Sequence, residues 1–530
     1  MRTHLLLALT FFAIQLQAQL WHPDAGDGTY KNPIIHADYS DPDVVCVGDD
    51  YYLTASSFNC APGLPILHSR DLVNWTIINY AFKKQVPLDH FSQPQHGNGT
   101  WAPSFRYHDG WYYIFWGDPD FGIYMVKTKD PAGKWEEPHL VQSAKGWIDP
   151  CPFWDDDGKA YLSHAFAGSR AGVKSVVILH EMAPDASRLL DDGLMVFDGH
   201  ENHPTIEGTK MHKREGWYYI FAPGGGVSTG WQTILRSKNV WGPYEDKIVL
   251  HQGDSDINGP HQGAWVETPL GEHWFIHFQE KQPYGRIVHL QPAQWKDGWL
   301  MMGKDSNNDG IGEPVLRWQK PKVRLRMAIP EQIPQTSDEF DKPVLGLQWQ
   351  WQANPGHTWA YPTPYGYLRM NPVKLPDIRN LWDTPSLLLQ KMPSEAFTAT
   401  TKLTFYHHDD GERTGLIVMG RDYAYLGLEQ QDGQLFLKQR SCIGAEHGEP
   451  EVTEASLLLE SNEIELRVEV KPGGLCQFSY SPDGEQFTPF GVPFQAKEGK
   501  WIGAKIGLFC AREQHLNDGG YVNVDWFRVK

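Results

Sequence analysis

Three acidic residues stand at the starts of three copies of one repeated sequence pattern. Asp41 opens DPDVVCVGDDYYLTAS, Asp149 opens DPCPFWDDDGKAYLSH, and Glu207 opens EGTKMHKREGWYYIFAP. Each copy has an apolar strand, an acidic or glycine turn, and an aromatic-rich strand. Carboxyl groups that meet in one site can act as general acid and general base, and hydrolysis of a glycosidic bond uses such a pair.

Two further copies, from Ala102 and Gln262, lack the acid. Five copies of short strands at a spacing on the order of 50 residues predict a five-bladed β-propeller, with one blade per copy. Blades around one axis bring equivalent positions together, so the three carboxyls are expected to converge. An Asp before Pro can also be only a turn residue, and Glu207 could be a solvated residue at a blade edge. The shared repeat position favours convergence, because independent surface acids would not need it.

The composition indicates an all-β protein. The 530 residues are enough for two or three domains, and they include 22 Trp, 22 Tyr, 24 Phe, 51 Gly and 38 Pro, with few long stretches of helical periodicity. A net charge of −18 argues against nucleic acid and anionic membranes as partners. The protein is therefore expected to be an acidic globular protein.

Residues 1–18 resemble a secretory signal peptide. Arg2 and His4 precede LLLALTFFAI, and a small residue, Ala18, follows. The apolar run is too short to span a bilayer, although a buried N-terminal strand remains an alternative reading. We expect an exported protein, periplasmic or extracellular. In such a compartment Cys46 and Cys60 could form a disulfide, but free buried cysteines remain equally open, and no spacing suggests zinc.

The chain divides into two domains. The repeats occupy 28–325, and a Gly- and Pro-rich stretch within 302–335 is expected to cross to the second domain. That stretch contains Asp305-x-Asn307-x-Asp309-Gly310, the opening of a calcium loop, but Leu316 replaces the Glu at the twelfth position, so a turn is predicted. Residues 336–530 alternate apolar and polar side chains between turns, which predicts a β-sandwich.

The repeat sequences also resemble glycoside hydrolase family 43. The resemblance lies in NPIIHADYSDPDVVCVGDDYYLTASSF, SRDLVNW, WAPSFRYHDGWYYIFWGD, WIDPCPFWDDDGKAYL, IEGTKMHKREGWYYIFAPGGG, GPHQGAWVETPLGEHWFIHFQ and YGRIVHLQPAQWKDGW, and it covers nearly all of 28–325 in order. The second domain is similar to the concanavalin-like domain of the β-xylosidase branch. The resemblance implies that Asp41 is the general base, Glu207 the general acid, and Asp149 the carboxylate that orients the acid and tunes its pKa. Ser40 and Thr209 depart from the commonest family pattern beside these acids, which puts fine substrate choice in doubt and leaves the carboxyls in place.

Four other residues are candidate substrate-binding groups. Trp101 and His261 precede the second and fifth copies and should face the central cavity, where an aromatic face can stack on a sugar. Phe58 is a weaker candidate of the same kind, and Arg286 matches the family's hydroxyl-binding arginine. Their alternatives are core aromatics for Trp101 and Phe58 and an inter-blade ion pair for Arg286.

Metal binding is a minor prediction. Several family members hold calcium or sodium on the propeller axis through a His at the place of His261, but calcium prefers oxygen ligands, so a hydrogen-bonding His is favoured. Asp338 and Asp525 could hold a structural calcium in the sandwich, or could be surface acids. No cofactor is expected to be required.

The sequence thus predicts an inverting exo-glycosidase that releases xylose or arabinose from plant cell-wall polysaccharide or oligosaccharide. A β-xylosidase is favoured, and an α-L-arabinofuranosidase is the alternative. A non-catalytic sugar-binding propeller would not need three convergent acids. Trp349, Trp351 and Trp359 could make the sandwich a carbohydrate-binding module, although docking on the propeller is favoured for them. The stretch 61–101 is expected to help close one end of the cavity.

Overall fold

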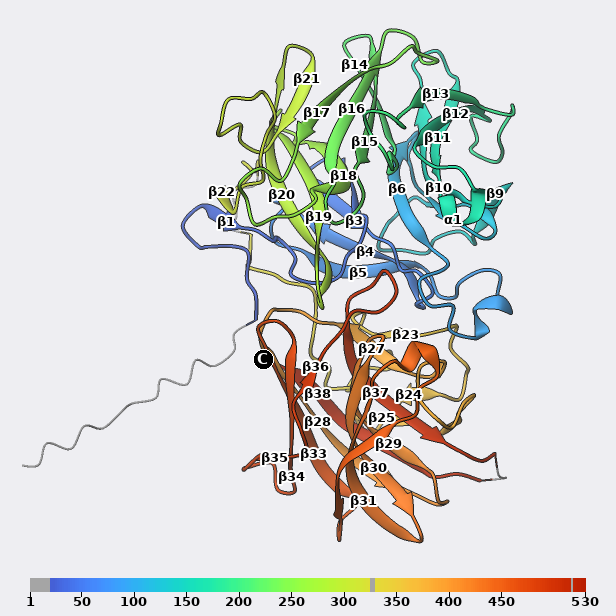
Figure 1. Cartoon of the computed structure of the whole chain (residues 1–530), viewed down its shortest axis with the longest axis vertical. Helices are drawn as coiled ribbons and strands as arrows, with labels where there is room; N and C mark the ends of the chain where they lie inside the picture. Colours follow the sequence, from blue (N-terminus) through green and yellow to red (C-terminus); the bar gives the residue numbers. More distant parts are fainter. Residues whose placement is uncertain (1–19, 325–328, 516–517) are drawn as a thin grey trace, which may run out of the picture.

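The protein consists of two all-β units arranged along its long axis (Figure 1). The computed structural model describes residues 20–324, 329–515 and 518–530, so the predicted signal peptide lies outside the described residues. The predicted fold, a five-bladed propeller followed by a sandwich, is confirmed. Within the described ranges, no helix has the length and apolar character needed to cross a membrane.

The propeller contains five four-stranded antiparallel sheets, each built from consecutive strands. Blade 1 comprises β2 (Asp43–Val47), β3 (Asp50–Thr54), β4 (Gly63–Ser69) and β5 (Thr76–Phe82). Blade 2 comprises β6 (Trp101–His108), β7 (Trp111–Asp118), β8 (Gly122–Thr128) and β9 (His139–Ser143). Blade 3 comprises β10 (Trp147–Trp154), β11 (Ala160–Phe166), β12 (Val176–Met182) and β13 (Leu194–Asp198), with the short helix α1 (Gly168–Ala171). Blade 4 comprises β14 (Lys210–Arg214), β15 (Trp217–Gly224), β16 (Trp231–Ser237) and β17 (Glu245–Leu250). Blade 5 comprises β18 (His261–Glu267), β19 (His273–Lys281), β20 (Gly285–Lys296) and β21 (Trp299–Met302).

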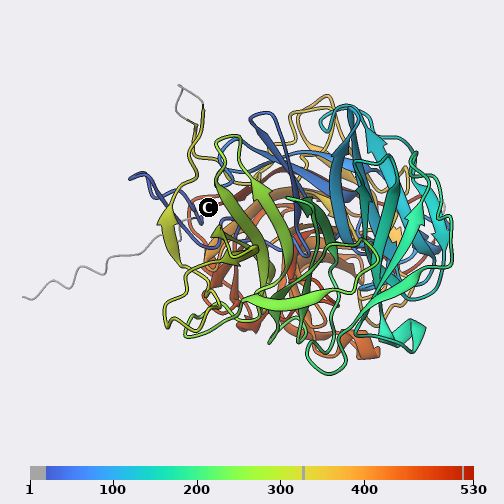
Figure 2. The ribbon, with the colours of Figure 1, turned by 90° about the horizontal axis from the view of Figure 1, so that it is seen from above.

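The first strands of the blades surround the propeller axis. Strand β6 contacts β2 and β10, β10 contacts β14, and β18 returns to contact β2. Figure 2 looks down on this ring, in which the blades succeed one another from blue to yellow-green. The ring is closed by β1 (Thr29–Lys31), which pairs with β22 (Arg317–Gln319), and by the Tyr30 hydroxyl, which donates to the Leu290 carbonyl at 2.8 Å.

Each blade begins at a residue in the left-handed backbone region. These residues are Asp41 (φ 54°), Ala102 (34°), Asp149 (57°), Gly208 (65°) and Gln262 (44°). The alignment of Glu207 with the two aspartates is therefore wrong by one residue, because Gly208 holds the equivalent position and Glu207 precedes it. A side chain at that position would crowd the blade, since a Cβ on Gly208 would lie 2.9 Å from Pro223 Cδ.

The second unit is a sandwich of two eight-stranded sheets. One sheet contains β23 (Gln350–Trp351), β27 (Leu388–Lys391), β37 (Lys505–Arg512), β29 (Arg413–Met419), β30 (Tyr423–Gln431), β31 (Gln434–Cys442) and β32 (Val452–Leu458), with β26 (Val373–Lys374) beside β37. The other contains β24 (Ala360–Pro362), β25 (Leu368–Met370), β38 (Tyr521–Val529), β28 (Phe397–Tyr406), β33 (Glu463–Lys471), β34 (Leu475–Ser481) and β35 (Thr488–Pro489), with β36 (Phe494–Gln495) beside β34. Two short 3₁₀ helices, His90–Ser92 and Ala445–His447, complete the secondary structure of the described residues.

The three tryptophans considered as a sugar-binding face belong to the sandwich core or pack against it. Trp349 and Trp351 are buried in this core and Trp359 packs against it, so they do not form the sugar-binding face considered as an alternative. Two propeller side chains, Tyr284 and Ile287, belong to the same core, which is therefore continuous with the other unit. This continuity fixes the sandwich against blade 5.

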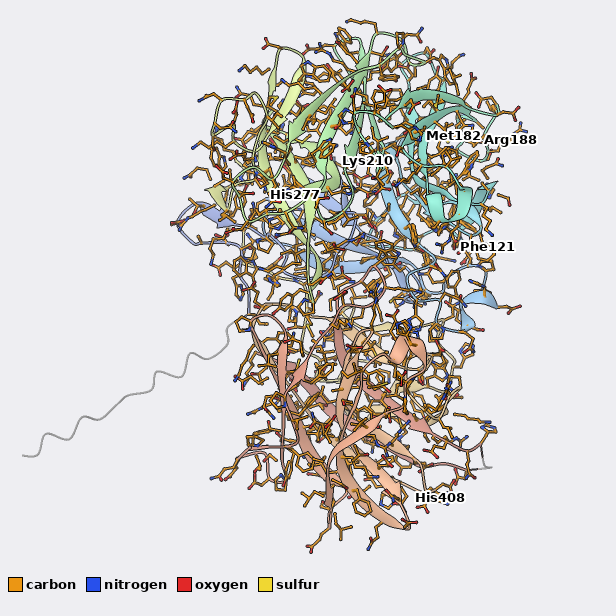
Figure 3. The ribbon with its side chains drawn as sticks, viewed as in Figure 1. Phe121, Met182, Arg188, Lys210, His277 and His408 are labelled. Carbon is orange, nitrogen blue, oxygen red and sulfur yellow. The ribbon has the colours of Figure 1, made fainter. Side chains whose placement is uncertain are left out.

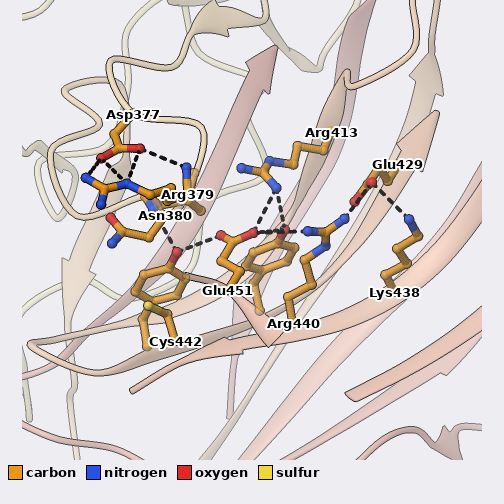
Figure 4. A network of polar contacts seen from close by, with 12 residues as sticks. Asp377, Arg379, Asn380, Arg413, Glu429, Lys438, Arg440, Cys442 and Glu451 are labelled. Carbon is orange, nitrogen blue, oxygen red and sulfur yellow. Dashed lines mark hydrogen bonds and ion pairs between the residues drawn. The ribbon is translucent and has the colours of Figure 1, made fainter. Parts of the chain in front are cut away.

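A charged network lies on the face of the sandwich sheet opposite that core (Figure 4). Glu451 accepts hydrogen bonds from Arg413 at 2.8 Å and from the Tyr423 hydroxyl at 2.6 Å, while Glu429 accepts from Arg440 and Lys438 at 2.6 and 2.9 Å. The side chains of Arg413 and Glu451 are each only 2% exposed. Buried charges are tolerated when they are paired and hydrogen-bonded in this way.

All six cysteines are free, so the considered Cys46–Cys60 disulfide does not form. Cys46 lies in β2 with its side chain partly exposed, whereas Cys60 is buried in the loop before β4. Cys60 Sγ instead accepts a hydrogen bond from Lys505 of the sandwich. The hydrogen-bond donor to the Cys60 thiol therefore belongs to the other unit.

Candidate active site

The three acids line one cavity at the centre of the propeller. The cavity has a volume of about 180 Å³, and Asp41, Asp149 and Glu207 all contribute to its wall. The rest of the wall is formed by Phe58, Trp101, Ala102, Ile148, Phe166, Ala167, Gly168, Ser169, Lys174, Thr205, Val227, Gln262, Arg286 and Trp501. The repeated blade starts thus place three carboxyls in one cavity, although Glu207 lies one residue before the start of its blade.

Asp41 is held by hydrogen-bond donors on both oxygens. Oδ2 accepts from the hydroxyls of Ser40 and Ser56 at 2.7 and 2.6 Å, and Oδ1 accepts from Arg286 Nη1 at 3.1 Å. Asp41 is 4% exposed. Charge-assisted donors of this kind favour a fixed carboxylate geometry, which a base that orients a water molecule requires. Ser40, where the family pattern has another residue, is part of this support.

Asp149 and Glu207 are coupled through the backbone of blade 4. Asp149 Oδ2 accepts from the Gly208 amide at 2.6 Å, directly after Glu207. Burial raises the pKa of Asp149, and the Asp41 charge adds to this, while the Gly208 amide and Lys210 oppose it. Burial also raises the pKa of Glu207, followed by the charges of Asp149 and Asp41. Glu207 therefore keeps its proton to a higher pH than an ordinary glutamate.

Below the acids, Lys210 supplies a buried positive charge. Its ammonium donates to the Pro103 carbonyl at 2.7 Å and to the Ser104 hydroxyl at 2.8 Å, and it lies 3.6 Å from Asp43. Figure 3 labels Lys210 inside the propeller, where the side chain is 1% exposed. It balances part of the negative charge that three carboxyls would otherwise concentrate near the axis.

Three of the four predicted substrate-binding residues line the cavity. Phe58 and Trp101 meet edge to face at 6.4 Å between ring centroids, and the Trp101 indole donates to the Gly97 carbonyl at 2.8 Å. Arg286 also lines it and contacts Asp41. His261 does not line the cavity: it is fully buried behind Glu207, with 3.6 Å between His261 Nε2 and Glu207 Oε1. Burial lowers the pKa of His261 to about 3, so its ring is neutral.

Sequence patterns missed Trp501, which comes from the sandwich. Its ring lies 6.4 Å from that of Trp101, edge to face, and 5.5 Å from the Arg286 guanidinium. The sequence shows only a tryptophan far from the repeats, and the left-handed backbone at Trp501, φ 61°, is known from the structure alone. Lys174 and Phe166 of blade 3 were also missed as cavity residues. The sandwich therefore contributes directly to the wall of the cavity.

One carboxylate joins the two units beside the site. Asp38 Oδ1 accepts from the Arg286 amide at 2.9 Å, and Asp38 Oδ2 accepts from the Gly503 amide at 3.0 Å. Arg286 belongs to β20 and Gly503 follows Trp501, so Asp38 sets the distance between two walls of the cavity. Part of the stretch 61–101 forms β4 and β5, and a later part supports the same side of the cavity, because the Gly97 carbonyl accepts a hydrogen bond from the Trp101 indole.

The candidate metal ligands have protein partners. Asp338 accepts from the Phe340 and Gly346 amides and from the Trp349 indole, all at 2.9–3.0 Å, and Asp525 lies 3.4 Å from Lys402. In the ranges that the structure covers, no group of three or more His, Cys, Asp or Glu is arranged to hold a metal. His261 offers nitrogen and no cluster of oxygens, which fits calcium poorly. The 305–310 segment is a turn closed by a hydrogen bond from the Gly310 amide to Asp305.

Comparison with known proteins places the chain in a family. The family model for glycosyl hydrolases family 43 matches residues 30–300, the whole ring of blades. The chain belongs to glycoside hydrolase family 43. A second model, for the beta xylosidase C-terminal concanavalin A-like domain, matches residues 337–530 of this family 43 hydrolase.

Its relatives span both domains. A Xylanibacter ruminicola protein, named provisionally as a beta-xylosidase, is 39% identical over 91% of this chain and 86% of its own length. A Bacteroides ovatus protein named as a non-reducing end alpha-L-arabinofuranosidase is 30% identical over 77% of each chain. The crystal structure of a xylan beta-1,4-xylosidase from Bacillus halodurans has a TM-score of 0.83, covering 94% of this chain and 99% of the other, and at 23% identity it supports the fold alone.

The geometry of this family 43 hydrolase suits acid–base hydrolysis. One carboxyl, Glu207, lines the cavity with a pKa that burial raises, while another, Asp41, is held by three donors. Glycoside hydrolysis requires this division, because one group must give a proton to the leaving oxygen while the other takes one from water. The chain is therefore a glycoside hydrolase whose chemistry its own carboxyls can supply.

Proposed function

We propose that the enzyme removes single pentose units from the ends of plant cell-wall xylan or related oligosaccharides, with inversion at the anomeric carbon. The observation that carries this proposal is the small cavity of about 180 Å³, which is lined by three carboxyls and four aromatic rings. Clefts that enclose drug-sized ligands occupy roughly 300–1,000 Å³. The cavity therefore suits one sugar ring at a closed end and not a long stretch of chain.

In the proposed mechanism, Asp41 accepts a proton from the water that attacks the anomeric carbon. Glu207 gives its proton to the leaving oxygen, and Asp149 keeps Glu207 protonated and positions it through the Gly208 amide. Arg286 anchors Asp41 and is close enough to bind sugar hydroxyls. The rings of Trp101 and Trp501 provide apolar faces for stacking on the sugar. These steps use carboxyls and water, and no cofactor is required.

Two activities are candidates, β-xylosidase and α-L-arabinofuranosidase, and β-xylosidase is favoured. Two relatives named as beta-xylosidases, one of them provisionally, cover more of the chain at higher identity than a relative named as a non-reducing end alpha-L-arabinofuranosidase, which supports this order. Hydrolysis of nitrophenyl β-D-xyloside, α-L-arabinofuranoside and hexoside controls will separate the two. We expect the xyloside to give the highest kcat/KM. A preference for any hexoside would contradict the pentose assignment.

The exo mode and the inversion have their own tests. On a ladder of xylo-oligosaccharides we expect monosaccharide alone from the earliest time points, because the cavity has room for one ring beyond the scissile bond. Early release of mixed oligosaccharides would mean an open cleft. Proton NMR of the first product should show the anomer opposite to that of the substrate, as an inverting pair of carboxyls requires.

The proposed location is outside the cytoplasm. The sequence of residues 1–18 supports this, with Arg2 and an apolar run ahead of Ala18. Expression of the whole chain with a C-terminal tag, followed by N-terminal sequencing of the exported form, should find cleavage after Ala18. A cytoplasmic product that keeps residue 1 would contradict it.

A further inference from the structure

Two reactive groups from different units meet in a buried contact near the cavity. The Lys505 amine lies 2.9 Å from Cys60 Sγ, and the two residues are 4% and 3% exposed. Cys60 belongs to the propeller and Lys505 to β37 of the sandwich. Among the described residues, the thiol is the one hydrogen-bond or ion-pair partner of this amine. A buried amine with a single sulfur partner is an uncommon arrangement, because a buried charge is usually paired with a carboxylate.

Both groups are held in place by their backbones. Cys60 N donates to Ser57 at 3.0 Å, and the Cys60 carbonyl accepts from Gln85 at 2.8 Å. Lys505 pairs with Lys391 on β27 and with Met419 on β29, within one sheet. The separation of nitrogen and sulfur is therefore set by rigid elements and not by a free surface side chain.

A second amine shares this site. Burial lowers the pKa of Lys391 to about 8, and the positive charge of Lys505 adds to the effect. The charge of Lys505 therefore disfavours a second positive charge on Lys391 beside it. When the Lys505 amine gives up its proton, its lone pair is within hydrogen-bond distance of the Cys60 sulfur and can react with that sulfur once it is oxidised.

We propose that Cys60 and Lys505 form an oxygen-bridged covalent crosslink between the two domains when the enzyme meets peroxide. Hydrogen peroxide first converts the Cys60 thiol to a sulfenic acid and leaves as water. In the second step a further peroxide accepts two electrons, the sulfenic O–H and one amine N–H break, an O–N bond forms, and two waters leave. The product is Cys60–S–O–NH–Lys505. One oxygen atom between sulfur and nitrogen needs little movement from the observed contact, whereas a direct S–N bond would require the two atoms to close to covalent distance.

The crosslink would lie close to two walls of the cavity. Cys60 follows Phe58 by two residues, and Lys505 follows Trp501 by four, and both aromatic rings line the cavity. Oxidation would therefore fasten the propeller loop to the sandwich strand beside the sugar site. This inference concerns the domain seam, and it does not depend on which pentose the enzyme releases.

Peptide mass spectrometry of the full-length protein tests the proposal. After treatment with hydrogen peroxide, a proteolytic digest should contain a joined peptide carrying Cys60 and Lys505, heavier than the two peptides together by one oxygen and lighter by two hydrogens. Excess dithiothreitol should restore both peptides. Cys60→Ser and Lys505→Arg should abolish the joined peptide, and Cys476→Ser, which removes another buried thiol, should leave it in place.

Three results would overturn the proposal. One is oxidation of Cys60 to the sulfinic acid with Lys505 unmodified. Another is a joined peptide that has lost two hydrogens and gained no oxygen, because that is a direct sulfur–nitrogen bond. The third is a joined peptide that persists in Lys505→Arg. Because the wild-type protein carries the main measurement, a variant that fails to fold does not decide the result.

Discussion

Asp149→Asn is expected to move the high-pH limit of activity downward. Asparagine keeps an oxygen that can accept from the Gly208 amide, a contact of 2.6 Å, but it removes the carboxylate charge. That charge helps to raise the pKa of Glu207, the proposed acid, after burial itself. Glu207 is active when protonated, so a lower pKa means that activity is lost at a lower pH. Below both pKa values the variant and the wild type should differ least.

The size of the shift follows from the charges at the site. A like charge a few ångströms away at an effective dielectric constant of about 20 contributes roughly 2–4 kcal/mol. Each pKa unit corresponds to ~1.4 kcal/mol. The pKa of Asp149 is itself raised by burial, so near neutral pH Asp149 carries only part of its charge. We therefore expect the high-pH limb of the activity profile to move down by about one pH unit, toward the low end of the usual ~1–3 unit range of pKa shifts caused by a neighbouring charge.

The assay is the pH dependence of kcat/KM on two substrates. Xylobiose has a poor leaving group and needs the acid, so its high-pH limb should move, while an activated aryl xyloside should report the acid weakly. Asp118→Asn is the matched control, because Asp118 is 2% exposed, accepts from the Asp120 amide at 2.9 Å and has a pKa raised by burial to about 7, yet it does not line the cavity. An unmoved limb in Asp149→Asn, or an equal shift in the control, would refute the reasoning.

Five further variants probe the site and the fold. Glu207→Ala should lose about 10²–10⁴-fold in kcat/KM on xylobiose and much less on activated aryl xylosides, whereas Asp41→Ala should lose activity on both substrates. The same pattern of losses in the two variants would contradict the assignment of acid and base. Trp501→Ala should raise KM about two- to tenfold with little change in kcat, since aromatic contacts contribute ~0.5–1.5 kcal/mol; an unchanged KM would remove the sandwich from sugar binding. Glu207→Gln should raise the thermal midpoint at pH 8 more than at pH 4, because an acid whose folded pKa is raised above 4.5 loses its stabilising contribution as pH increases from that value. Glu451→Gln should lower the free energy of unfolding by ~3 kcal/mol by leaving buried Arg413 without its charge partner, and a loss under ~1 kcal/mol in urea titration would contradict this.

Much of the propeller could be predicted because each blade repeats the same local chemistry. An apolar strand, a turn and an aromatic strand recur at every start, and a ring is the arrangement that buries all of them. The one-residue error at Glu207 arose because the acid was taken as the start of its copy. Gly208 carried the correct signal, since glycine suits the left-handed position that Asp41 and Asp149 also occupy.

The rest of the site depends on contacts that no local pattern records. Trp501 reaches the cavity only because the sandwich docks on blade 5, and docking depends on a core that includes Tyr284 of the propeller. His261 precedes its blade start as Trp101 does, yet Trp101 lines the cavity and His261 is covered. The neighbouring blades decide which side chain at a blade start reaches the cavity. The amino-acid sequence of one blade does not contain this information.

The closure of the ring has a consequence for the order of events during synthesis. A ribosome releases the residues of blade 1 first, yet β1 cannot find its partner until β22, at 317–319, has also emerged. At roughly 5–20 residues per second, β1 waits some tens of seconds without its partner strand. The wall carrying Trp501 arrives later still. The nascent chain therefore passes through an interval in which the three carboxyls are already synthesised but the cavity around them is incomplete. A chaperone that covers exposed strand edges would act in that interval.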